Sequence, residues 1–187
     1  MSNLKDLGVK TYIFPQPVLI IGTYGEDGTP DAMNAAWGGT GDDDQVVICL
    51  SHTHATNKNY ERTGAFTVGI PGADVTAAAD LMGVASATKV PDKIARAGWT
   101  YAKAPHVDAP VFDQIKLTLE CEFLGYDGYG RTVGKVVNVL ADESILADDG
   151  QPDIAKLDPI TYDPAHHGYH RIGEKVGQAF HDGLALK

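Results

Sequence analysis

One short segment, residues 51–59 (SHTHATNKN), gathers hydroxyl, imidazole and amide side chains. It follows an apolar run typical of a strand and leads into a stretch compatible with a helix. Hydroxyl groups at a helix start, where backbone N–H groups have no partner, are suited to binding a phosphate. Thr56 could equally be an ordinary N-cap residue, so both interpretations stay open. Lys89 and Lys93 could supply positive charge nearby.

A second segment, residues 31–37 (DAMNAAW), combines small residues with a tryptophan. Small side chains in a strand let a flat ligand approach the backbone closely, and Trp37 could stack against such a ligand. The alternative is that Trp37 anchors the core, which is a common place for a tryptophan. The pattern alone does not separate these two interpretations.

The histidines could suggest a metal site, because His166 and His170 lie four residues apart and His167 is adjacent. However, Pro164 and Gly168 argue against a helix, and no carboxylate at a supporting interval is recognised. We therefore expect solvated histidines and no metal. A metal-dependent hydrolase that uses His52, His54, His166 or His170 remains an alternative.

Nucleophilic catalysis finds no support in the motifs. Ser51 and His52 are adjacent, so in a strand their side chains face opposite ways. The chain also lacks the GxSxG motif of serine hydrolases. We predict no catalytic side chain.

The elements that must position these segments are mostly strands. Alternating or continuous apolar runs predict a mainly β chain, a β-barrel with helical insertions, and Gly134 is a candidate β-bulge. With 21 Gly and 10 Pro the chain is rich in turns. We expect one domain over residues 1–187. The predicted strands are 11–14, 18–24, 45–51, 65–70, 114–124, 131–142 and 160–162, and the predicted helices are 56–63, 76–82 and 91–97.

Composition limits the possible partners. The 187-residue chain has a formal net charge of −10, which argues against a nucleic-acid or anionic-membrane surface. Cys49 and Cys121 lie in apolar runs and are predicted to be buried free thiols. No secretory signal or membrane span is recognised, so we expect a cytoplasmic protein.

Taken together, the sequence resembles the flavin reductase-like, FMN-binding split-barrel family, particularly its flavoredoxin-like branch. The resemblance covers nearly the whole chain in order. It implies a Greek-key split β-barrel, and a homodimer with one FMN per protomer near the interface. The segments that carry it are PVLIIGTYGEDGTPDAMNAAW, SHTHATNKNYERTGAFTVGIP, GVASATKVPDKIARAG, LTLECEFLG, GKVVNVLADESIL and GEKVGQAFHDGL.

The resemblance also implies roles for particular residues. Four residues would face the isoalloxazine ring, five would hold the phosphate and ribityl chain, and Lys89 would lie close to the cofactor. Tyr169 and the GEKVG segment that follows would cover the flavin. Many flavin reductases have Arg or Lys where His54 and Ala55 stand, so phosphate binding here would depend more on hydroxyls, helix amides and Lys89. The four ring-facing residues are Asn34, Ala35, Ala36 and Trp37. The five that would hold the phosphate and ribityl chain are Ser51, Thr53, His54, Thr56 and Asn59.

The implied activity is that of an NAD(P)H-dependent FMN oxidoreductase, in which the flavin carries the electrons and the protein binds and orients it. NAD(P)H would stack on the exposed flavin face. A variant of the same hypothesis is an electron carrier that needs a redox partner protein. The alternative is a non-catalytic flavin-binding module, acting as a sensor or store.

Overall fold

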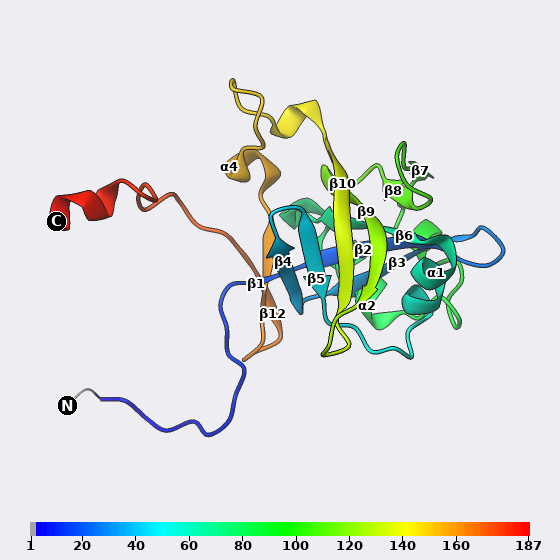
Figure 1. Ribbon diagram of the computed structural model, residues 1–187, viewed down its shortest axis with the longest axis horizontal. Coiled ribbons are helices and arrows are strands. Elements are labelled where there is room, and N and C mark those ends of the chain that lie inside the picture. The colour runs from blue at the N-terminus through cyan, green and yellow to red at the C-terminus, as the bar shows by residue number, and fades with distance from the viewer. Residues whose placement is uncertain (1–2) are drawn as a thin grey trace.

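A curled, seven-stranded antiparallel sheet forms the body of the protein in the computed structural model, which describes residues 3–187 (Figure 1). Its curl gives the half-barrel of a split β-barrel. The predicted mainly β fold is therefore confirmed. In spatial order the strands are β3 (Pro30–Ala35), β2 (Leu19–Tyr24), β6 (Ala65–Ile70), β9 (Leu117–Tyr126), β10 (Thr132–Ala141), β5 (Gln45–Ile48) and β4 (Gly38–Asp42).

Both faces of the central strands are covered. One apolar cluster fills the inside of the curled sheet, and a second packs between the sheet and the helices on its outer face. This explains why the apolar residues of β2 and β6 follow one another continuously and do not alternate with polar residues. The first cluster includes Leu19, Ile21, Ile48, Tyr60, Phe66 and Cys121; the second includes Ile20, Met82, Ile94, Trp99 and Phe112.

The hairpin of β9 and β10 is the longest in the sheet and contains two irregularities. The register shifts between Val133 and Gly134 and again between Val136 and Asn138. A Cβ atom at Gly134 would collide with the ring of Phe66, so glycine is required for the strand to approach the core this closely. An irregularity beside Gly134 is therefore present as predicted, but the extra residue there is Leu124 of β9, and the extra residue of β10 is Val137.

The helices are short and attach to the sheet at defined places. Helix α1 (Ala55–Thr63) ends at Gly64, which adopts the left-handed conformation with φ 70, as the glycine stop signal predicts. No helix among residues 3–187 is long and apolar enough to cross a membrane. The remaining helical elements are η1 (Ala73–Val75), α2 (Thr76–Val84), α3 (Lys93–Arg96), η2 (Glu143–Ile145), α4 (Ile154–Leu157) and η3 (Asp182–Leu186).

A three-stranded sheet lies beside the main sheet and joins the two ends of the chain. It consists of β1 (Gln16–Pro17), β11 (Ile160–Asp163) and β12 (Gly168–Arg171) in the order β1-β11-β12. A two-stranded ribbon, β7 (Tyr101–Lys103) and β8 (Pro110–Phe112), completes the fold.

Two predictions made from apolar runs are wrong. Residues 11–14 form no strand and are exposed; they precede β1 and find no pairing partner, although their residue types favour strands. Cys49 is exposed, whereas Cys121 is buried as predicted. Cys49 follows the last residue of β5, so its side chain lies beyond the part of that strand that packs on the core.

Candidate functional site

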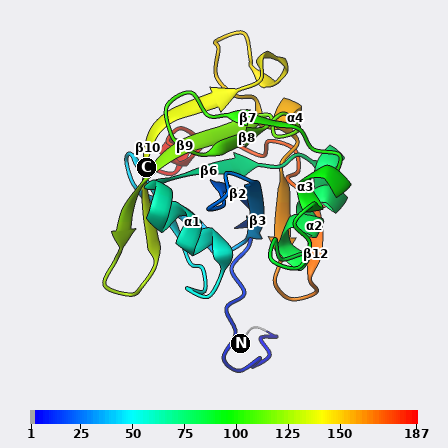
Figure 2. The same cartoon turned by 90° about the vertical axis from the view of Figure 1, so that its right-hand side faces the viewer.

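A cavity of about 250 Å³ lies between the loop before α1 and the loop after α2. Both helices pack beside β3, which forms the floor between them (Figure 2). The lining therefore comes from three separate parts of the sequence. It includes Asp31 and Met33 of β3, Thr53 and His54 before α1, Ala55 and Thr56 at its start, Gly83 near the end of α2, Ser86 and Thr88 after that helix, and Lys93 of α3.

The start of α1 presents unsatisfied polar groups to this cavity. The N-cap residue is His54, which makes no side-chain cap hydrogen bond, and its buried Nδ1 atom has no hydrogen-bond partner. Backbone N–H groups of a first helical turn have no intrahelical acceptor. The helix start is thus ready to bind an anion.

The prediction that Thr56 could be the N-cap is wrong. A turn over residues 51–54, closed by the His54 N–H donating to the Ser51 carbonyl at 3.1 Å, starts the helix one residue earlier than expected. Thr56 is consequently inside the first turn, is buried, and lines the cavity. Its hydroxyl is therefore available for a ligand.

Lys93 places a buried positive charge at the cavity. Its Nζ lies 2.8 Å from Asp31 Oδ1 and donates to the Ala85 carbonyl at 3.0 Å. Because Asp31 also lines the cavity, this pairing compensates a carboxylate that would otherwise repel an anion. Lys89, the lysine favoured by the resemblance, is exposed and does not line the cavity. Nothing in the spacing distinguishes the two lysines; the start of α3 at Lys93 turns that side chain inward.

Asn34 and Tyr169 lie together although 135 positions separate them. Asn34 Nδ2 donates to the Ala79 carbonyl at 3.0 Å and to the Tyr169 hydroxyl at 3.4 Å. The Tyr169 hydroxyl donates to Asp80 Oδ1 at 2.8 Å. Burial and then the hydrogen bond to Asp80 raise the pKa of Tyr169 to about 12. This network fixes β12 against β3 and α2.

An aromatic wall continues from that network. The Trp37 ring lies 6.0 Å from the Tyr162 ring, which lies 6.1 Å from the Tyr169 ring. Trp37 is 48% exposed, so the core-anchor interpretation is wrong and its ring is free to stack on a flat ligand. We use "aromatic wall" below for Trp37, Tyr162 and Tyr169.

The other predicted residues are placed differently. Asn59 Nδ2 donates to Thr23 Oγ1 at 3.0 Å, and Ala35 belongs to the apolar cluster inside the curled sheet. Ala36 is partly buried just after β3. Ser51 Oγ hydrogen-bonds Thr53 Oγ1 at 2.9 Å and so supports the cavity from its edge. Only Thr53, His54 and Thr56 of this predicted set line it.

The histidine segment contains a carboxylate that the sequence reasoning missed. Asp163 Oδ2 accepts from His166 Nδ1 at 2.8 Å and lies 3.8 Å from His170 Nε2. The hydrogen bond from His166 holds the pKa of Asp163 below its ordinary value. The spacing hid this contact because the β11–β12 turn, not a helix, brings the side chains together. No group of three His, Cys, Asp or Glu suited to a metal occurs among residues 3–187.

Comparison with known proteins places this geometry in a family. The flavin reductase like domain matches residues 11–172. The chain belongs to the flavin reductase-like family. It is similar to the flavoredoxin of Desulfovibrio vulgaris (Miyazaki F), with 34% identity, a TM-score of 0.92, and 96% of this chain and 99% of that chain covered. This places it in the flavoredoxin branch, with a flavin-related oxidoreductase function.

More distant structures share the fold. A flavoredoxin from Methanosarcina acetivorans has 22% identity and a TM-score of 0.88, covering 98% of this chain and 100% of that one. An FMN-binding domain of a flavin reductases-like enzyme from Shewanella baltica OS155 has 18% identity and a TM-score of 0.77, covering 87% and 89%. No curated protein sequence matches the chain.

The residues present fit the phosphate end of a flavin mononucleotide. The unpartnered Nδ1 of His54, the uncapped start of α1 and the hydroxyls of Thr53 and Thr56 converge on one cavity. Its volume of about 250 Å³ is below the ~300–1,000 Å³ of pockets that enclose a whole drug-sized ligand. It therefore suits a phosphate with part of a ribityl chain, and leaves the flavin ring outside the cavity.

Proposed function

We propose that this protein is an FMN-binding oxidoreductase of the flavoredoxin type, which passes electrons from NAD(P)H through FMN to an acceptor. The observation that carries the proposal is the convergence of the α1 start, the hydroxyls and Lys93 on one cavity. The name of the Shewanella baltica structure as an FMN-binding domain supports the same cofactor.

Each part of the chain has a distinct role in this proposal. Bound FMN supplies the hydride and electron chemistry. The α1 start, Thr53 and Thr56 bind the phosphate, while Lys93 neutralises the Asp31 carboxylate, which would otherwise repel it. Asn34 and Tyr169 orient the aromatic wall, and Trp37 packs on the ring. No side chain of the cavity has to act as a general acid or base.

We further propose that the protein is a homodimer with FMN near the interface, and that it delivers electrons to a separate redox partner protein. NAD(P)H would approach the face of the ring that the aromatic wall leaves open. The exposure of Trp37 supports an accessible ring. The proposals of a homodimer and of a redox partner protein do not depend on FMN binding in the cavity, and they need separate tests.

The test is an anaerobic titration of the FMN-loaded protein with NADH and, separately, with NADPH. The absorbance of the flavin is recorded after each addition of the nucleotide. Bleaching by either nucleotide supports the oxidoreductase. Tight FMN binding without reduction by either nucleotide or by an added reductase would contradict it and favour the flavin-binding module. Turnover with excess free FMN would separate a flavin reductase from a carrier.

A further inference from the structure

The last fifteen residues of the chain stand clear of the body. This C-terminal arm, residues 173–187, is exposed throughout. Its hydrogen bonds are local: Gln178 N–H donates to Asp182 Oδ2 at 2.7 Å, and Lys175 Nζ to Gln178 Oε1 at 2.6 Å. No hydrogen bond or ion pair joins the arm to the rest of residues 3–187. The GEKVG segment therefore does not cover the cavity of its own protomer.

The arm carries large apolar side chains with nothing to pack on. Val176, Phe180 and Leu186 are almost fully exposed, and Leu184 is half-exposed. The N-terminal segment, residues 3–14, has the same character. Both leave the three-stranded sheet and project on the same side of the body (Figure 1). Such apolar segments normally mark an interaction surface.

The accessible surface of the chain is larger than that of a compact monomer, and the excess indicates how much surface a partner could cover. The chain exposes 11402 Å², whereas a compact monomer of its mass exposes roughly 8,700 Å². The excess of roughly 2,700 Å² is more than the ~800 Å² that each partner contributes to a standard interface. A second copy of the same chain, with the same excess, would supply an interface of the size found in permanent dimers.

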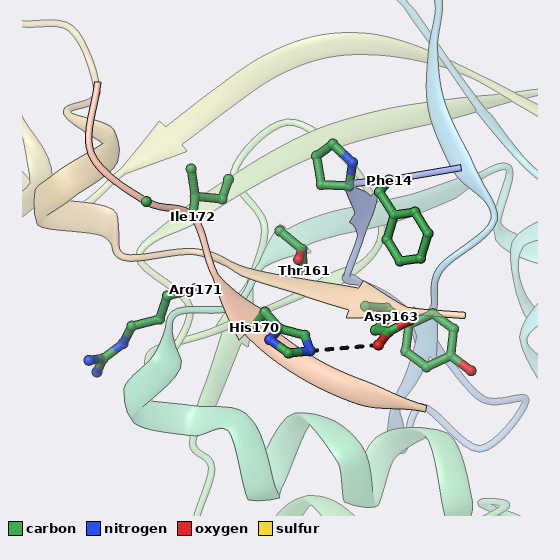
Figure 3. Close-up of a pocket in the computed structure, with 9 residues that line it drawn as sticks. Phe14, Thr161, Asp163, His170, Arg171 and Ile172 are labelled. Atoms are coloured by element: carbon green, nitrogen blue, oxygen red, sulfur yellow. Dashed lines mark ion pairs between the residues drawn. The ribbon is translucent and has the colours of Figure 1, made fainter. Parts of the chain in front are cut away.

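A groove of about 520 Å³ lies at the root of the arm. Its lining combines Phe14 and Pro15, which precede β1, with Thr161 and Tyr162 of β11 and with Ile172, which follows β12; Phe14, Thr161 and Ile172 are labelled in Figure 3. Arg171 also lines the groove and pairs with Asp158, with Nε 3.1 Å from Oδ2, and Asp163 Oδ2 lies 3.8 Å from His170 Nε2. The apolar parts of this lining suit an exposed apolar side chain of the arm, such as Phe180.

The chain's own arm is poorly placed to fill this groove. Ile172 and Gly173 already form its wall, and residues 173–177 continue without a turn. Seven extended residues can carry Phe180 up to ~24 Å from Gly173. A second copy could supply an arm that is not tethered at this wall, and in a two-fold pair the same contact would serve both arms.

We propose that each copy in the homodimer seats its C-terminal arm in the groove of the other copy, with Phe180 as the apolar anchor. This inference rests on the homodimer proposed above, and it adds that the two copies exchange their C-terminal arms. Because Tyr162 lines the groove and also packs on Trp37, a seated arm supports the aromatic wall of the copy that receives it.

Cysteine trapping tests the exchange directly. In a Cys49→Ser background, which removes the exposed native thiol, Ile172→Cys and Phe180→Cys are combined in one chain and mildly oxidised. A covalent dimer on a non-reducing gel is expected. An internal disulfide in a monomeric chain would overturn the proposal, as would a dimer without the cross-link. Tyr129→Cys, at the exposed tip of the β9–β10 hairpin, replaces Ile172→Cys in the control.

Sedimentation equilibrium separates failure of the arm from failure of the dimer. Removal of residues 173–187 should raise the dimer dissociation constant at least tenfold, and Phe180→Ser several-fold, while Tyr129→Ser leaves it unchanged. A monomeric full-length protein at micromolar concentration would refute the homodimer and the exchange together. A full-length dimer that the truncation leaves equally tight would refute the exchange alone. Unchanged far-UV circular dichroism and an unchanged urea unfolding midpoint of the monomer verify that each variant is folded.

Discussion

The two ends of the candidate flavin site are built in different ways. The cavity proposed to bind the phosphate is lined in part by buried groups, among them Thr56 and the ion pair of Lys93 with Asp31, which are anchored in the seven-stranded sheet and its helices. The aromatic wall is partly open, and Tyr162 and Tyr169 come from the three-stranded sheet. One end is preformed within a single chain, whereas the other is open to solvent.

This difference follows from what supports each end. The cavity rests on strands that pack on two apolar clusters. The wall rests on strands of two to four residues, next to the groove and the two exposed chain ends. Elements with few buried contacts open locally at lower free energy than the core does. We therefore expect phosphate binding to be a rigid property of the fold, and ring binding to depend more on the surroundings.

The largest effect is expected from Lys93→Met. This change leaves the Asp31 carboxylate buried without its partner, which typically costs about 3–5 kcal/mol of unfolding free energy. Urea denaturation measures it. Lys89→Met, at an exposed lysine, is the control and should change stability by less than ~0.5 kcal/mol. Equal stabilities for the two variants would show that the cavity is not held by this ion pair.

Thr56→Val tests the cavity without changing its shape. Loss of one hydrogen bond to a charged phosphate, about 1.5 kcal/mol, should weaken FMN binding roughly tenfold. Quenching of flavin fluorescence gives the dissociation constant. Thr63→Val, at the other end of the same helix, should leave FMN affinity unchanged. Wild-type affinity in the Thr56 variant would mean that the phosphate lies elsewhere.

Trp37→Ala tests the open end. Loss of ring packing should weaken FMN binding about fivefold, since such aromatic contacts contribute about 1 kcal/mol. Trp37→Phe should retain most of the affinity. Because Trp37 is exposed, the unfolding free energy should hardly change. A loss of about 3–5 kcal/mol, as for a core tryptophan, would contradict the placement of this residue in the wall.

The smallest effect concerns pH. The hydrogen bond from His166 lowers the pKa of Asp163 in the folded state below its ordinary value of 3.8. The unfolded chain then binds more protons, so this contribution to stability is present above pH ~4 and is lost as pH falls through the lowered pKa. Asp163→Asn should make the acid branch of a stability–pH curve shallower. An unchanged slope would show that Asp163 does not contribute to the acid dependence of stability. As a control, the affinity for FMN at pH 7 should stay unchanged.

Much of the fold could be predicted from the sequence because its signals are local. The apolar runs of β2, β5 and β6 and the glycine after α1 all act within a few residues. By contrast, the exposed segment over residues 11–14 has strand-like composition, and only the absence of a pairing partner decides its state. Strand formation depends on such non-local pairing.

The candidate site shows the same limit. The segment that contains Thr53, His54 and Thr56 could be recognised from its residue types next to a predicted helix. The inward turn of Lys93, and the contacts of Asn34 with Tyr169 and of Asp163 with His166, could not. They depend on where α3 begins and on a turn between two short strands. Those details follow from tertiary packing, not from spacing along the chain.

The central claim is that the cavity at the start of α1 binds a flavin phosphate. The most direct measurement compares the dissociation constants of FMN and riboflavin, which differ only in that phosphate, for the purified wild-type protein. With at least two charge-assisted hydrogen bonds to the phosphate, FMN should bind about a hundredfold more tightly or better. Equal affinities for FMN and riboflavin would contradict the claim.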